Sequence, residues 1–138
     1  MSDPLSIALS GLRSASTKAG AAASNIANVS TSGAREGADG PEAYQPVDVV
    51  ETSFAAESGE PHGVKAEVVP RKPATTPVYS PQTAYADEDG LIDAPNVDLN
   101  EEVIDLKYAE LAYKANAAVA RVAIDIQDEI LDRFDERV

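Results

Sequence analysis

Few side chains in this sequence could do chemistry, and their spacing does not fit an active site. His62 is the only histidine and there is no cysteine, so neither a histidine pair nor a thiolate can clamp a metal. The acidic run at 87–90 invites comparison with a calcium-binding loop. Placing Gly90 at that loop's invariant glycine puts Tyr85 first and Asn96 twelfth, where an oxygen ligand and a bidentate glutamate are needed. The run therefore predicts a polar turn at Asp89–Gly90, and His62 is predicted to be a solvated loop residue.

Composition and charge exclude further classes of protein. The 138 residues include 24 acidic and 11 basic side chains, and the net charge of −13 repels nucleic-acid phosphates and anionic lipid. The sequence has no glycine-rich phosphate loop and no serine nucleophile motif, so we predict no enzyme and no cofactor. No apolar run approaches the ~20 residues of a membrane span. The first residues do not read as an ordinary secretory signal, so export would use another route.

Residues 1–30 predict a helix. Ser2 or Asp3 can cap its N-terminus, and Pro4 fits its first turn. The helix should end near Asn25 and Asn28, because asparagine competes with the helical backbone for hydrogen bonds. A seven-residue repeat of apolar and small residues follows one side of this helix. Its members are Leu5, Leu9, Leu12, Ser16, Ala19, Ala23 and Ile26.

Residues 31–97 predict loops and a small β region. Valines occur in short β-like runs at 45–54 and 63–69, which are typical of strands. The segment between them, 55–63, contains Gly59, Pro61 and Gly63, so we expect a hairpin with a mobile tip. Prolines at 70, 73, 77 and 81 then predict an extended segment.

Residues 98–138 predict a long helix. Asp98 and Glu101 form a variant of the capping box, and no glycine or proline interrupts the chain from Leu99 to Glu136. Such a helix is about 55 Å long, too long for the inside of so small a globule. Its apolar stripe consists of Ile104, Tyr108, Leu111, Ala115, Ala118, Val122, Ile126 and Ile130.

These elements predict a mainly α protein with a small β middle. Long N- and C-terminal helices would pair as a coiled coil, with a short β-hairpin region between them. Hydrophobic residues make up 43% of the chain, but much of this is alanine and only 5% of the chain is aromatic. A large buried core is therefore not expected, and helix-to-helix assembly with other molecules is favoured. The alternative is that each helix packs only on the core of its own protein.

Two motifs, one near each end, resemble a known family. The stretch "SNIANVSTSGAR" at 24–35 resembles the signature of bacterial flagellar axial proteins, with Ala27 and Asn28 at its alanine–asparagine pair. The stretch "LAYKANAAVARVA" at 111–123 resembles the partner motif, carried by Tyr113, Ala115 and Asn116. Residues 63–69 and 77–106, together with the overall length, are similar to the short proximal-rod members, the basal-body rod proteins of the FlgC type.

The resemblance implies a structural role in the bacterial flagellum. Such proteins are exported by the flagellar type III export apparatus without a cleaved signal peptide. They stack helically into the basal-body rod, which crosses the periplasm and transmits motor torque. Terminal helices line the inner tube as a coiled-coil layer, and partners are other proximal rod subunits, the distal rod subunit and the export-gate junction protein. This sequence departs from the family at 128–138, where its C-terminal end is strongly acidic.

The expected assembly interface combines the helix stripes with the two motifs. Asn28 and Asn116 are predicted to set the register between neighbours, as a buried asparagine does in a coiled coil. Local helix capping is the alternative role for Asn28. The full set of predicted interface residues is Leu5, Leu9, Leu12, Ile26, Asn28, Leu111, Tyr113, Asn116, Val122 and Ile126.

Two other functions compete with the rod subunit. A soluble, acidic coiled-coil adaptor of the cytoplasm would explain the acidic C-terminal end. A divergent paralogue of the main rod subunit would explain the same departure from the family. An adaptor should be fully helical alone with a fixed small stoichiometry, whereas the helices of a rod subunit should gain order when neighbours complete their interfaces.

Overall fold

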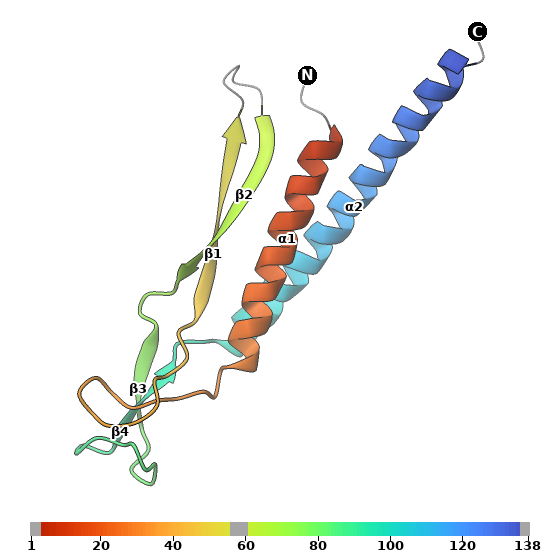
Figure 1. The fold of residues 1–138 in the computed structure, drawn as a ribbon. Helices are drawn as coiled ribbons and strands as arrows, with labels where there is room; N and C mark the ends of the chain where they lie inside the picture. Colours follow the sequence, from red (N-terminus) through yellow and green to blue (C-terminus); the bar gives the residue numbers. More distant parts are fainter. Residues whose placement is uncertain (1–3, 56–60, 136–138) are drawn as a thin grey trace.

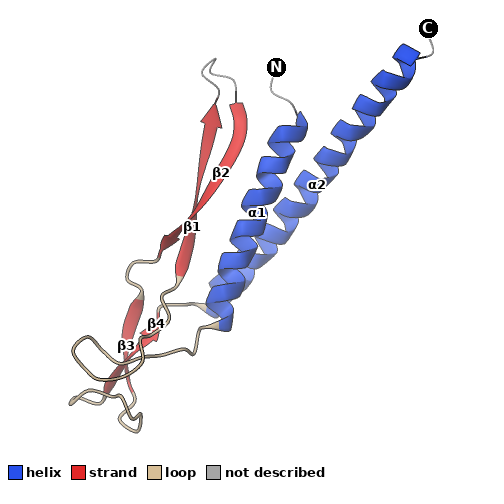
Figure 2. Cartoon of the chain, viewed as in Figure 1, coloured by secondary structure: helices blue, strands red, loops and turns tan. Residues whose placement is uncertain are grey.

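Two long helices and two β-hairpins form an elongated molecule (Figure 1). The structure is a computed structural model, and it describes residues 4–55 and 61–135. The elements are α1 (Pro4–Ala27), β1 (Val47–Ala55), β2 (Pro61–Pro70), β3 (Thr75–Tyr79), β4 (Leu91–Pro95) and α2 (Leu99–Asp135). Figure 2 shows the predicted order, a helix at each end and a β region between. The proposed caps Ser2 and Asp3 and the tip of the first hairpin, 56–60, lie outside the described residues.

The two helices pack against each other and run antiparallel (Figure 1). The predicted cap of α2 is confirmed, because the N–H groups of Asn100 and Glu101 lie 2.8 and 3.3 Å from a carboxylate oxygen of Asp98. With no glycine or proline inside it, α2 continues for 37 residues, as the sequence predicted.

The first hairpin lies along α1. β1 pairs antiparallel with β2, from Val47 opposite Pro70 to Ala55 opposite Pro61. The predicted hairpin is therefore confirmed, but its strands extend further than expected. His62 belongs to β2 and is half-buried, so its predicted place in a solvated loop is wrong. Pairing with β1 extends the strand through the glycine and proline that suggested a loop.

A second hairpin occupies the segment that the prolines predicted to be merely extended. β3 pairs antiparallel with β4, from Thr75 opposite Pro95 to Tyr79 opposite Leu91. Pro77 lies inside β3, opposite Asp93. A proline is tolerated there because each strand of a two-stranded sheet has one free edge where no N–H is needed. The single expected hairpin region is thus two separate two-stranded sheets.

The acidic run at 87–90 forms the predicted polar turn. The N–H of Gly90 donates to the carbonyl of Asp87 at 2.9 Å, and Gly90 has a φ of 75°. The Asp87 carboxylate accepts the N–H of Leu91 at 2.8 Å and a guanidinium N–H of Arg35 at 2.9 Å. The Leu91 bond first, and the Arg35 bond after it, lower the pKa of Asp87. The carboxylate therefore holds the turn together.

Backbone bonds tie the segment after α1 to the second hairpin. Gly33 and Asp93 exchange two hydrogen bonds, of 2.9 and 3.0 Å. A Cβ atom at Gly33 would lie 2.1 Å from the backbone nitrogen of Ala43, so only glycine fits this crossing. The chain leaving α1 is thereby fixed against β4.

The buried core consists almost entirely of alanine. Among the described residues, the buried hydrophobic side chains are Ala8, Ala15, Ala22, Ala43, Ile92, Ala109, Ala120 and Ala123. An alanine buries little apolar surface, so this core contributes little hydrophobic stabilisation. The expectation that the chain has no large core of its own is confirmed.

Candidate assembly interface

Asn25 joins the end of α1 to two other elements. Its side chain is 1% exposed, and its amide nitrogen donates to the Val47 carbonyl at 2.9 Å and to Glu102 at 3.0 Å. Its amide oxygen accepts the Val47 N–H and the Tyr44 hydroxyl, each at 3.1 Å. All donor and acceptor positions of this amide are therefore used. Asn25 links α1, the start of β1 and the first turn of α2.

An ion-pair cluster continues from Asn25 into α2. Glu102 is 2% exposed, and Arg71 donates to its carboxylate at 2.8 Å. The same guanidinium pairs with Asp48 at 2.7 Å and donates to the Asn96 carbonyl at 3.0 Å. Burial lowers the pKa of Arg71, but the bonds to Asp48 and Glu102 outweigh it and raise that pKa. We call Asn25, Asp48, Arg71 and Glu102 the polar joint.

Above the polar joint, small residues line the seam between the helices. On α1 the seam residues are Ala8, Ala15 and Ala22, seven positions apart and at most 3% exposed. On α2 the seam positions are Glu102, Ala109, Asn116 and Ala123, also seven apart. Small side chains let the two helix axes approach closely. A Cβ atom on Gly11 would lie 2.3 Å from the amide oxygen of Asn116, so glycine makes room for this larger side chain.

The first hairpin is attached to α1 by polar contacts. The Ser10 hydroxyl accepts the N–H of Val64 at 3.1 Å. The carboxylate of Glu51 accepts a hydrogen bond from Ser14 and pairs with Lys18. The bond from Lys18 first, and that from Ser14 next, lower the pKa of Glu51. The hairpin is therefore held against the helix pair along its length as well as at the polar joint.

The seam does not use the stripes that the sequence singled out. On α1 it lies three positions after the predicted stripe, so that Ala8 replaces Leu5. On α2 it lies two positions before, so that Ala109 replaces Leu111, about 160° around the helix. The two helices therefore pack through the seam, and the apolar stripe of α2 faces away from α1. The larger apolar side chains of α2 are left on its outer face.

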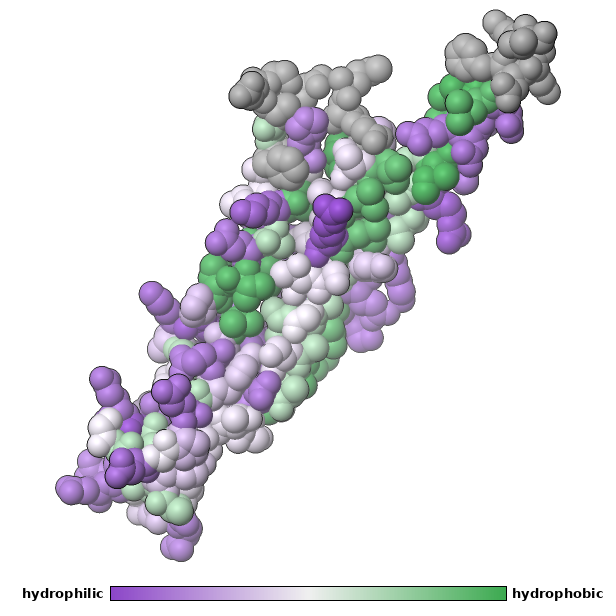
Figure 3. All heavy atoms as spheres, in the orientation of Figure 1, coloured by the Kyte–Doolittle hydropathy of each residue, from purple (hydrophilic) through white to green (hydrophobic). Residues whose placement is uncertain are grey.

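The outer face of α2 is apolar and exposed. Leu111 is 65% exposed, Val122 56% and Ile126 54%. Figure 3 shows hydrophobic side chains over the upper half of the helix pair, and hydrophilic ones at the lower end around β3 and β4. Apolar surface arranged along one helix in this way is typical of a contact with another molecule. We define the outer face by Ile104, Tyr108, Leu111, Ala115, Ala118, Val122, Ile126 and Ile130.

The predicted interface residues divide into three groups in the structure. Leu9, Leu111, Tyr113, Val122 and Ile126 are exposed, and Leu5, Leu12 and Ile26 are half-buried on α1. The Asn28 amide donates to the Ser24 carbonyl at 2.9 Å, which is the geometry of the local alternative. Asn116 donates to the Ala112 carbonyl at 2.8 Å and packs over Gly11.

Sequence reasoning missed all four members of the polar joint. The sequence marks Asn25 only as a residue near the end of a helix, and it does not single out Asp48, Arg71 or Glu102. A carboxylate in the first turn of a helix normally reads as a solvated partner of the helix dipole. The only sequence feature that could have marked Glu102 as buried is its position. It lies one turn after the Asp98 cap, on the same side of the helix as Ala109.

A groove of about 810 Å³ lies between the first hairpin and the helix pair. Apart from Asp105, the charged side chains that line it are engaged with each other, Lys18 with Glu51 and Arg71 with Asp48 and Glu102. In the described part of the chain, no three histidine, cysteine or acidic side chains are grouped so that they could hold a metal. Within the same residues, no helix is both long and apolar enough to cross a membrane.

Comparison with known proteins places the arrangement in context. The chain is 31% identical over 138 residues to the flagellar basal-body rod protein FlgC of Agrobacterium fabrum, covering 94% of this chain and 95% of the relative. It is 35% identical over 114 residues to the proteins of the same name from Escherichia coli O6:H1 and Salmonella typhimurium, covering 82% of each chain. No protein-family model matches the chain.

Proposed function

Because the chain belongs to the FlgC family of flagellar basal-body rod proteins, we propose that it is a structural subunit of the rod that assembles helically through the outer sides of its two helices. In this proposal it joins copies of itself and other rod subunits, and the resulting rod transmits torque. The observation that carries the proposal is the exposed, apolar outer face of α2. The relatives are named as basal-body rod proteins, so we propose that this face contributes to the rod.

The energetics of the two faces of α2 support assembly. The inward face is already filled by small residues of α1, and the large side chains point outward. Each large apolar side chain buried fully at an interface contributes roughly 1.5–3 kcal/mol. Repeating the same contact from copy to copy along a helical assembly makes a long, open polymer rather than a closed ring.

The polar joint suits the transmission of torque. It connects both helices with β1 and with Arg71, the residue after β2, and its bonds to Glu102 and Arg71 are charge-assisted. Such bonds hold the first hairpin at one angle to the helix pair, so every copy presents the same shape. Force applied to the hairpin layer would then reach the helix layer without a flexible hinge.

The partners and the route to the rod are also part of the proposal. The chain would leave the cytoplasm through the flagellar type III export apparatus without losing a signal peptide. It would then meet the other proximal rod subunits, the distal rod subunit and the export-gate junction protein, in a rod that spans the periplasm. In such a layer the paired helices of neighbouring copies would form the coiled-coil inner tube.

Deleting the gene and imaging the basal bodies tests this function. Cells without the chain should have no complete rod and should not swim, and the wild-type gene should restore both. A chain carrying Val122→Asp and Ile126→Asp should fold normally, because both positions are exposed, but should not restore the rod.

The matched control changes Val50→Asp and Val68→Asp, two equally exposed valines on the first hairpin. It should restore rods and swimming, because the helices and not the hairpin carry the proposed contact. Normal rods and normal swimming in the deletion strain would overturn the function. An acidic adaptor would instead leave the basal bodies complete.

A further inference from the structure

The distal half of α2 carries an apolar surface that residues 4–55 and 61–135 leave exposed. A groove of about 390 Å³ lies where the start of α1 meets α2, and apart from Gln127 its lining is apolar. Pro4 contributes from α1, and Val119, Val122 and Ile126 contribute from α2. Val122 and Ile126 also belong to the outer face, so the groove joins that face to the start of α1.

One edge of this groove is acidic. Asp125 and Glu129 each follow a groove residue, Val122 and Ile126, by three positions, so they lie beside them on the helix surface. Asp132 continues the same edge one turn further on. Between 125 and 135 the helix has five acidic side chains and a single basic one, Arg133, which pairs with Glu129 at 2.9 Å.

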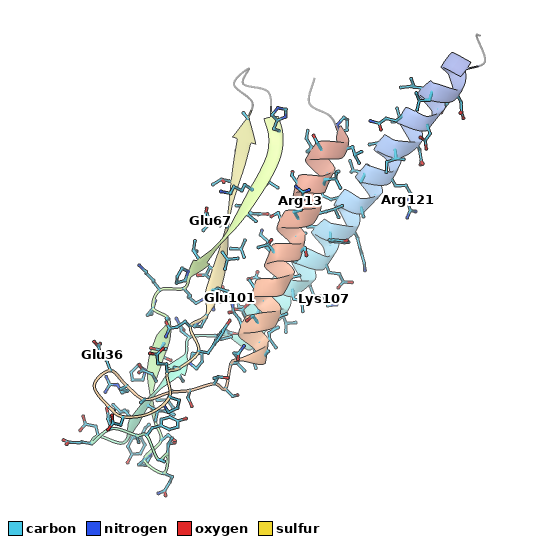
Figure 4. All side chains as sticks on the ribbon, in the orientation of Figure 1. Arg13, Glu36, Glu67, Glu101, Lys107 and Arg121 are labelled. Carbon is cyan, nitrogen blue, oxygen red and sulfur yellow. The ribbon has the colours of Figure 1, made fainter. Side chains whose placement is uncertain are left out.

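A second copy of this chain is a poor electrostatic match for that edge. The only charged side chains of α1 are Arg13 and Lys18, and Lys18 already pairs with Glu51. If a copy docked through its α1, it would therefore offer one further exposed cation, Arg13 (Figure 4), to an edge of Asp125, Glu129 and Asp132. Two copies with a net charge of −13 each also repel one another over the length of their fields.

We infer that the distal half of α2 docks a basic amphipathic helix from a different protein, and that its acidic edge disfavours a second copy at this position. The apolar groove receives the partner's apolar stripe, and Asp125, Glu129 and Asp132 face lysines or arginines beside that stripe. The inference rests on the proposed rod function and narrows its partners by their charge. It also gives a role to the acidic end by which this sequence departs from its family.

The test measures the binding of two synthetic helices to the full chain. Each peptide is about 20 residues long with the same leucine stripe, flanked by lysine in one and by glutamate in the other. Fluorescence anisotropy at about 50 mM salt should show the lysine peptide binding about tenfold more tightly. At about 300 mM salt the preference should shrink, because the exposed charges are screened.

Two triple variants that remove the same number of charges separate the effect of the acidic edge from the effect of the overall charge of the chain. Asp125→Asn, Glu129→Gln and Asp132→Asn together should abolish the preference for lysine. Glu36→Gln, Asp39→Asn and Glu42→Gln together remove the same charge from exposed positions in the loop after α1, and they should leave the preference intact. Figure 4 shows Glu36 at the opposite end of the molecule from the distal half of α2. A third variant, Val122→Ser with Ile126→Ser, should weaken both peptides.

Equal loss of preference in the two charge variants would overturn the inference, because overall charge alone would then explain the binding. Self-association of the wild-type chain at low salt, relieved by Val122→Ser with Ile126→Ser in sedimentation experiments, would overturn it by showing a second copy in the groove. The rod function fails separately, through complete basal bodies in the deletion strain. If rods require this chain but the chain shows no preference for the lysine peptide, the proposed basic partner is wrong and the rod function still holds.

Discussion

The base of the helix pair and its distal half are built on different chemistry. At the base, the polar joint brings together four side chains, from both helices, from β1 and from the residue that follows β2, and three of the four have little access to water. In the distal half, alanines fill the seam and the large apolar side chains face outward. The base fixes the shape of one subunit, whereas the distal half exposes a hydrophobic surface that we propose contacts another subunit.

The largest effect should come from breaking the base. Arg71→Ala leaves the buried carboxylate of Glu102 without its cation, and losing one partner of such a pair destabilises a protein by about 3 kcal/mol or more. Urea unfolding should show this as a lower midpoint. Arg133→Ala removes an exposed pair of the distal half and should shift stability by less than about 0.5 kcal/mol. Similar losses in both variants would erase the proposed difference.

Overfilling the seam should have the next largest effect. Ala15→Leu puts three additional carbons where a side chain is 2% exposed, and overpacking of this kind costs about 1–3 kcal/mol. Ala23→Leu makes the same change at an exposed position of α1 and should be nearly neutral. Thermal unfolding followed by circular dichroism at 222 nm compares the two variants. If Ala15→Leu proved harmless, the helices would not be as closely packed as the seam requires.

A smaller, pH-dependent effect should mark the attachment of the hairpin. Lys18 and Ser14 lower the pKa of Glu51 below its value of 4.5 in an unfolded chain. The stability that Glu51 contributes is therefore present above pH 4.5 and is lost as the pH falls through the lowered pKa. Because the pair is more than one-third exposed, the loss should stay below about 1 kcal/mol.

Glu51→Gln should remove this acid-dependent part while leaving the distal half unchanged. Stability measured by urea titration from pH 7 to about pH 3 would then fall less steeply in the variant than in the wild type. A Lys65→Met control removes an exposed pair with Glu67 at 3.9 Å and should leave the slope as it was. Identical slopes for wild type and Glu51→Gln would contradict the assigned role of Glu51.

The smallest effect on the isolated chain should come from the outer face. Ile126→Ser replaces a side chain that is 54% exposed and should change the free energy of unfolding by less than about 0.5 kcal/mol. The same variant should clearly weaken assembly, and this contrast between folding and assembly is the sharpest test of the two regions. A strong loss of monomer stability would mean that Ile126 already packs within its own subunit.

The ends of the molecule were more predictable from sequence than its centre. The long helix followed from the Asp98 cap and an uninterrupted chain, and both are local signals. The polar joint depends on residues far apart in sequence, since Asn25 meets Glu102 and Asp48 meets Arg71. Neither hydrophobic periodicity nor helix and strand propensity predicts such long-range contacts, because both describe only residues that are close together along the chain.

The sequence also did not predict which face of each helix packs against the other helix. Both helices have two seven-residue repeats, one of alanine or polar residues and one with larger apolar residues, and hydrophobicity alone favours the second. Close approach of the two axes favours the smaller one instead, and this is a tertiary effect that overrides the local pattern. The second hairpin was missed for a related reason, because Pro77 argues against a strand unless one edge of that strand is free.

The two helices are unequal in length, and this has a thermodynamic consequence. Pro4, the first described residue of α1, lines the same groove as Gln127 of α2, and the eight residues 128–135 extend about 12 Å beyond Gln127. Most helical stability in proteins comes from packing, so the end of a helix that extends beyond its partner frays readily. Backbone amides in this overhang should exchange with solvent quickly in the free subunit and slowly once a neighbour lies over them. The rate of hydrogen exchange at 128–135 should therefore measure the fraction of subunits that have been incorporated into an assembly.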